Sequence, residues 1–75
     1  MATREERLEE AAKLYDQAAV ELDQAAAHAR WSARHFRDGE IPRGAAHSWA
    51  ARGHILAAEQ ALDEQALEHR KQSKT

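Results

Sequence analysis

The chain has 75 residues with a net charge of −2, contains no cysteine, and carries alanine at 18 positions. A short chain without cysteine has neither disulfides nor thiolate metal sites, and its mild charge gives little overall attraction for nucleic acid. Alanine, Glu, Arg, Gln and Leu dominate and favour helices, whereas Val and Ile together supply only three residues for a sheet. We therefore expect a single small all-α domain.

The distribution of charged and apolar residues bears on where the protein resides. The charged start MATREERLEE lacks the apolar core of a signal peptide, and no apolar run is long enough to span a membrane. Residues 1–24 carry three basic and seven acidic groups, whereas residues 25–54 carry five and two. The lack of a signal peptide and of a spanning segment predicts a cytoplasmic protein that makes no contact with a membrane.

The first predicted helix covers residues 4–38. Thr3 and Glu6 form the T-x-x-E pattern of a capping box, so the helix should begin directly after Thr3. Gly39 suits the position that follows a helix end. One face of this helix predicts a coiled-coil stripe that packs on the second helix. The stripe comprises Leu8, Tyr15, Leu22, Ala29 and Phe36, every seven residues, beside Ala11, Ala18 and Ala25.

The second predicted helix covers residues 42–70, after a turn at 39–41. Pro42 suits the first helical position, and the final residues 71–75 have the composition of a frayed tail. Because the turn is so short, the two helices should lie antiparallel as a hairpin.

Apolar residues surround much of the second helix. One stripe comprises Ala51, Ile55, Ala58, Leu62 and Ala66, and another comprises Trp49, Gly53, Leu56 and Leu67. One partner helix cannot cover both stripes, so we predict a homodimer that forms a four-helix bundle. The predicted interface residues are Trp31, Trp49, Ile55, Leu56 and Leu62. The uneven charge favours an antiparallel dimer with Trp49 near its centre.

Four histidines are the first candidate site. When the chain folds near residue 41, His35 comes level with His47, and His28 with His54, which predicts two rungs. Such a cluster could bind a divalent metal or respond to pH. Metal sites on one helix use spacings of three or four, which these histidines lack. We therefore expect packing histidines, with the pair on the second helix buried and the pair on the first solvated.

The two tryptophans are the second candidate site. Trp31 and Trp49 lie near five arginines, an arrangement that could hold single-stranded nucleic acid. Tryptophan beside alanine stripes is more often part of a core or an interface, so nucleic-acid binding is the less favoured hypothesis. No nucleophile motif or phosphate loop is present, so we expect no enzyme and no cofactor.

The segment HFRDGEIPRGAAHSWAARGHILAAEQALDE, residues 35–64, contains a G-E-x-P-R-G turn followed by an alanine-rich helix with His and Gly. It resembles small all-helical proteins of high-GC actinobacteria. That resemblance implies a helical protein with no assigned activity. The favoured function is therefore a small non-enzymatic interaction or scaffold module that pairs with itself, with an unknown protein as a further partner. The alternatives are a histidine-based metal or pH sensor and a nucleic-acid binder.

Overall fold

The first helix begins where the capping box predicted. The Thr3 hydroxyl accepts a hydrogen bond from the Glu6 backbone N–H at 3.1 Å, and the Glu6 carboxylate accepts one from the Thr3 N–H at 3.3 Å. These two bonds satisfy N–H groups that an uncapped helix would leave without a partner. The computed structural model describes residues 2–72 and has two helices, α1 over Arg4–Arg37 and α2 over Ile41–Gln72.

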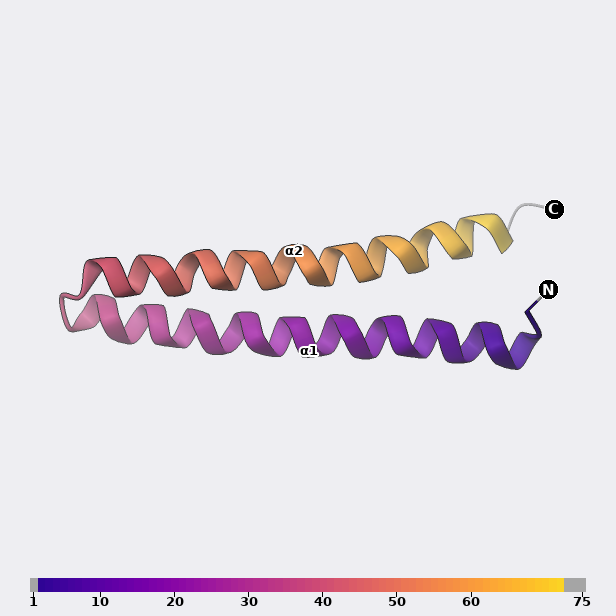
Figure 1. Cartoon of the computed structure of the whole chain (residues 1–75), viewed down its shortest axis with the longest axis horizontal. Helices are drawn as coiled ribbons and strands as arrows, with labels where there is room; N and C mark the ends of the chain where they lie inside the picture. The colour runs from indigo at the N-terminus through magenta and orange to yellow at the C-terminus, as the bar shows by residue number, and fades with distance from the viewer. Residues whose placement is uncertain (1, 73–75) are drawn as a thin grey trace.

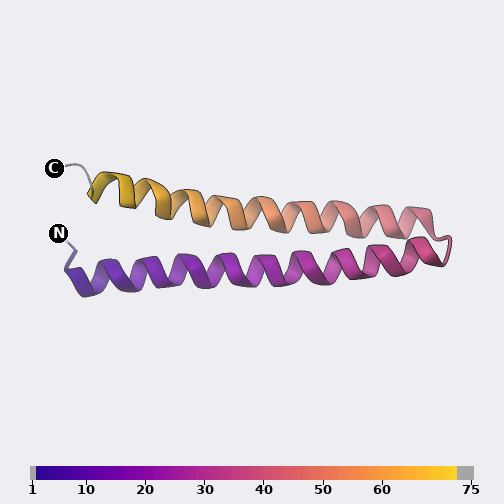
Figure 2. The ribbon, with the colours of Figure 1, turned by 180° about the vertical axis from the view of Figure 1, so that it is seen from behind.

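The two helices form an antiparallel hairpin (Figure 1). The view from behind shows them side by side along their whole length (Figure 2). The hairpin is a slab of 56 × 19 × 13 Å. The predicted all-α class and the predicted hairpin are therefore confirmed. Among the described residues, neither helix contains a segment that stays apolar over the length needed to cross a bilayer.

The turn depends on Gly39, which has a φ of +77°. Its N–H donates to the Phe36 carbonyl oxygen at 3.0 Å, and the Glu40 N–H donates to the His35 carbonyl oxygen at 2.8 Å. These bonds satisfy carbonyl groups at the end of α1. α2 then begins at Ile41, one residue before the predicted start.

The end of α2 differs from the prediction. Lys71 and Gln72, which the composition placed in a frayed tail, belong to the helix. The other three residues of the predicted tail, 73–75, lie outside the described residues. His69, Arg70 and Lys71 lie in the last turn, where positive charge is favourable because the helix dipole is negative there.

Alanine substitution at two glycines should change the free energy of unfolding in opposite directions. Gly39→Ala forces a side chain into the left-handed region and should destabilise the hairpin by about 1 kcal/mol. Gly53 lies inside α2 with nothing within 4 Å of an added Cβ, so Gly53→Ala should stabilise the protein by about 0.5–1 kcal/mol. Urea denaturation of both variants measures the difference, and equal shifts would contradict the assigned backbone conformations.

Small residues form the contact between the helices. Ala18, Ala58 and Ala61 are buried together, and Leu14 is the larger apolar side chain that packs against them. Small side chains let two helix backbones approach closely, so this contact buries little apolar area for its length. Among residues 2–71, one polar side chain is also buried, that of Ser32.

Ser32 is satisfied across the helix contact. Its hydroxyl donates to the Gly44 carbonyl oxygen at 2.9 Å and lies 3.3 Å from the Ser48 hydroxyl. A buried hydroxyl costs free energy unless it finds such a partner. These contacts hold the turn end of α1 against the first turns of α2.

The predicted stripe on α1 is only half correct. Its alanine half faces α2 as predicted, because Ala18 and Ala25 are buried. Its large apolar half does not: Leu8, Tyr15, Leu22 and Phe36 are each about half exposed. The helix is rotated so that another heptad row lies inward beside the alanines. That row comprises Leu14, Glu21, His28 and His35.

Close approach explains this rotation. Two alanine ridges bring the backbones together, and bulky side chains on both helices would hold them apart. The flat imidazole rings fit the narrow gap because they stack on one another. The large apolar row of α1 is consequently directed away from α2.

Candidate functional site: a histidine column beside an apolar face

Four imidazole rings form a continuous stack between the helices. We call His54, His28, His47 and His35, in this order, the histidine column. Its successive ring centroids are 5.3, 5.1 and 5.3 Å apart. The rings alternate between α2 and α1, so the column joins the two helices over nearly two turns. Trp31 flanks the column, with its ring 5.9 Å from His35 and 6.2 Å from His47.

A hydrogen bond between two imidazoles joins the middle of the column. The Nδ1 atoms of His28 and His47 are 2.9 Å apart. An imidazole nitrogen donates only when it carries a hydrogen and accepts only when it does not. The bond therefore requires one hydrogen between the two nitrogens. It persists if one ring gains a charge, and it is lost if both rings are charged.

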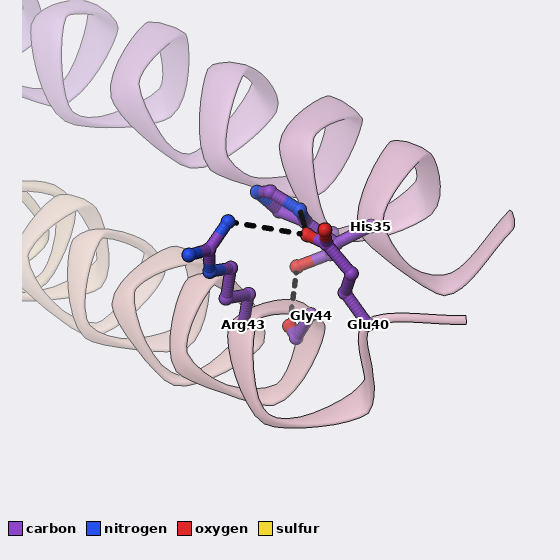
Figure 3. A network of polar contacts seen from close by, with 5 residues as sticks. His35, Glu40, Arg43 and Gly44 are labelled. Carbon is purple, nitrogen blue, oxygen red and sulfur yellow. Dashed lines mark hydrogen bonds and ion pairs between the residues drawn. The ribbon is translucent and has the colours of Figure 1, made fainter. Parts of the chain in front are cut away.

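A carboxylate lies at each end of the column. The His54 Nδ1 is 2.5 Å from the Glu21 Oε2, and the His35 Nδ1 is 2.7 Å from the Glu40 Oε2. Glu40 also lies 3.5 Å from the Arg43 guanidinium. Figure 3 shows the Glu40 carboxylate in contact with both the His35 ring and the Arg43 guanidinium. The outer rings thus have acidic partners, whereas the inner pair has only neighbouring imidazoles.

The sequence predicted the assembly of this column but not its surroundings. The two rungs are confirmed, since His35 stacks on His47 and His28 stacks on His54. The expected difference in burial is wrong: the His35 side chain is 16% exposed and that of His54 is 31% exposed. The rotation of α1 explains the error, because it turns both of its histidines inward.

The carboxylate partners were missed altogether. Glu21, His28 and His35 are spaced by seven, so they share one row of α1, and this spacing was the available signal. Glu40 lies in the turn, where periodicity carries no information. Its contact depends on the path of the chain after Gly39.

The column does not have the arrangement of a metal centre. Across residues 2–72, no three His, Asp or Glu side chains are grouped so that they could hold a metal ion. Each Nδ1 of the column is instead directed at one partner, either another imidazole or a carboxylate. The four histidines considered as metal ligands therefore come together as a stack and not as a ligand set.

The two tryptophans do not share one platform. The Arg34 guanidinium lies over the Trp31 ring, 4.6 Å from its centroid, and an open hollow of about 230 Å³ beside them is lined by α1 alone. Trp49 is 77% exposed on α2. The arrangement considered for single-stranded nucleic acid is thus divided between separate surfaces.

A row of large apolar side chains from α1 and two large apolar side chains from α2 share the side of the slab opposite the column. On α1, the alanine ridge has the histidine row on one side and the row of Leu22 on the other. On α2, the ridge of Ala51 and Ala58 has His47 and His54 on one side and Ile55 and Leu62 on the other. Because the histidine rows meet on one side of the slab, the remaining rows share the other.

We call this surface the apolar face. It comprises Leu8, Tyr15, Leu22, Ala29 and Phe36 of α1 with Ile55 and Leu62 of α2. Phe36 spans the helices there, since its ring lies 2.6 Å from where a Cβ on Gly44 would be. The next row of α1 extends the face with small side chains. It comprises Ala12, Ala19, Ala26 and Ala33.

Comparison of the chain with known protein families, with curated proteins and with solved structures finds no significant match in any of the three. The resemblance of residues 35–64 to actinobacterial helical proteins therefore stays a prediction. No functional residue is transferred to this chain from a relative, and the function is argued from the column and the apolar face.

Proposed function

We propose that the protein is a non-enzymatic module that associates with itself, pairing two hairpins through the apolar face into a four-helix bundle. The observation that carries this proposal is the exposure of the face. Its large side chains Leu8, Tyr15, Leu22, Phe36 and Leu62 are each 41–55% exposed, whereas the apolar residues buried at the contact between the helices are alanines. A contiguous apolar surface of this kind marks an interaction site in a protein dissolved in water.

The energetics of a lone hairpin support the same proposal. Ordering a residue costs about 1–2 kcal/mol of backbone entropy, which burial of apolar area must offset. Alanine side chains bury little area, and small domains usually need a further source of stability such as oligomerisation. Pairing two apolar faces would bury the large side chains of the face itself, which a single hairpin leaves about half exposed.

The proposed interface changes the set of residues expected from the sequence. Ile55 and Leu62 lie on the apolar face and are retained. Trp31 packs beside the histidine column, and Trp49 and Leu56, seven residues apart, share a row on another side of α2. Leu22 is instead the central residue of the proposed interface, because it lies midway between Leu8 and Phe36 along the apolar face.

Leu22→Glu should abolish or strongly weaken self-association. A carboxylate in the middle of a dry interface has no partner, and the loss should exceed about 2 kcal/mol, or more than tenfold in the dissociation constant. Val20→Glu is the matched control, because Val20 lies two residues away, is 58% exposed and does not belong to the apolar face. Analytical ultracentrifugation of both variants measures the effect.

Trp49→Ala tests the competing surface in the same experiment. If the row of Trp49 and Leu56 formed the interface, Trp49→Ala would dissociate the protein and Leu22→Glu would leave it intact. The apolar-face proposal requires the reverse result.

The histidine column favours a second candidate function, which is a response to acid. We propose that the column makes the stability of the hairpin depend on pH, because its centre holds one hydrogen between two nitrogens 2.9 Å apart. Histidine is the side chain whose ordinary charge change lies between about pH 5 and 8. This property would belong to the hairpin itself and does not require self-association.

A further inference from the structure

The apolar face carries a charge pattern that is complementary to itself. Arg52 and Glu59 lie in the row of α2 that borders Ile55 and Leu62, one heptad apart. Both side chains are exposed, and no ion pair within the hairpin is found for either one among the described residues. A two-fold axis that passes between them would place each Arg52 beside Glu59 of the partner subunit.

We propose that the second copy lies antiparallel on the apolar face, with α1 against the partner's α1 and α2 against the partner's α2, about a two-fold axis at the level of Ala26 and Ile55. This arrangement rests on the proposed self-association and specifies its register. It places the two turns at opposite ends of the bundle. In the alternative arrangement both turns lie at one end of the bundle, and α2 packs on the partner's α1. Arg52 and Glu59 would then lie against the alanine row of the partner's α1 and would not pair with each other.

Side-chain sizes on α1 agree with the same axis. An antiparallel pairing centred between residues 25 and 26 sets Tyr15 opposite the partner's Phe36, and Leu22 opposite the partner's Ala29. The first pair is aromatic on aromatic, and the second sets a large side chain against a small one. Alternation of large and small side chains is what interdigitated helix faces need.

The level of the axis is consistent between the two helices. His28 lies level with His54 in the hairpin, because their rings stack. Ala26, two residues before His28, is therefore level with Leu56, two residues after His54, which is within one residue of Ile55. The charge pair on α2 and the size pattern on α1 are separate features of the sequence, and both lead to one axis.

The uneven charge of the chain favours this orientation as well. The acidic residues gather in the first 24 residues, near the open end, and the basic excess lies in residues 25–54, around the turn. In an antiparallel pair the basic turn end of one hairpin lies over the acidic half of the other. Such complementarity selects an orientation even where it adds little affinity.

Exchange of the two charges tests the register. Arg52→Glu and Glu59→Arg should each weaken the dimer about tenfold, because each turns two attractive pairs into two repulsive ones. The double variant restores both pairs and should return the dissociation constant to within about twofold of the wild-type value. Arg34→Glu, whose guanidinium lies over the Trp31 ring of α1 and not on the apolar face, controls for the change in net charge.

The outcomes separate the register from the proposed function. A wild-type protein that is monomeric would overturn self-association itself. A wild-type dimer that ignores both single substitutions, or a double variant that fails to restore it, would overturn the register alone.

A distance measurement gives an independent reading of the orientation. Spin labels at Asp38→Cys, beside the turn, should be about 40 Å apart in the antiparallel dimer, given the helical rise of about 1.5 Å per residue. With both turns at one end, the labels would lie within about 20 Å because packed helices are only about 10 Å apart. The short distance would overturn the proposal.

Discussion

Ala58→Leu should destabilise the hairpin by about 3 kcal/mol, because it overfills the closest contact between the helices. Ala58 is 1% exposed and packs in the alanine cluster with Ala18 and Ala61. A leucine there must push the backbones apart. That movement would also stretch the Ser32 bond to Gly44 and separate the stacked imidazole rings.

Ala46→Leu is the matched control for this substitution. Ala46 is exposed on the same helix, so leucine there should change the free energy of unfolding by less than about 0.5 kcal/mol. Urea denaturation followed by circular dichroism measures both variants. If Ala58→Leu were as mild as its control, or stabilising, the close approach of the two helices would be wrong.

Acidification from about pH 7 to about pH 5, the range in which histidines gain charge, should destabilise the hairpin. A charge on both His28 and His47 would place two N–H groups face to face and break the bond between their Nδ1 atoms, now 2.9 Å apart. Two unit charges about 5 Å apart repel by about 3 kcal/mol at an effective dielectric constant of about 20.

The groups around the column determine the sign of the effect. Glu21 lies beside His54 and Glu40 lies beside His35, so a charge on either outer ring has an acidic partner within the hairpin. Arg43 also pairs with the Glu40 carboxylate, so the acidic partner of His35 is shared with an arginine at that end of the column. The loss of stability should therefore come from the inner pair, His28 and His47.

Two glutamine substitutions separate the inner pair from other histidines. His28→Gln retains a group that can hydrogen-bond to His47 and removes one charge, so it should at least halve the loss of stability on acidification. His69→Gln, at an exposed site near the end of α2 outside the column, should leave that loss unchanged. Urea midpoints measured at several pH values provide the comparison. An identical pH dependence in all three proteins would contradict the role of the column.

Much of the fold was predictable because local signals agreed with one another. The Thr3–Glu6 capping box set the start of α1, and Gly39 followed by Pro42 set the turn. The short turn then required antiparallel helices. These signals act within a few residues, so they need no knowledge of the packing.

The face of α1 that meets α2 was not predictable in the same way. The alanine ridge of Ala18 and Ala25 is flanked by two rows, one with large apolar side chains and one with His28 and His35. A hydrophobic pattern favours the first row, and close packing between alanines favours the second. Only the geometry of the paired helices decides between them.

The column itself was half predictable for the same reason. Equal distances from the turn are enough to set His28 level with His54, and His35 level with His47. Whether the rings face inward depends on the rotation of α1, and so does the pairing of Glu21 with His54. Contacts that depend on helix rotation lie beyond what spacing alone can indicate.

The solution mass of the wild-type protein tests the central proposal most directly. Sedimentation equilibrium over a range of protein concentrations should give about twice the chain mass of 8.4 kDa at micromolar concentration, with dissociation on dilution. A mass of 8.4 kDa at every concentration, from a protein that still unfolds cooperatively, would contradict the proposal that the apolar face pairs with a second copy.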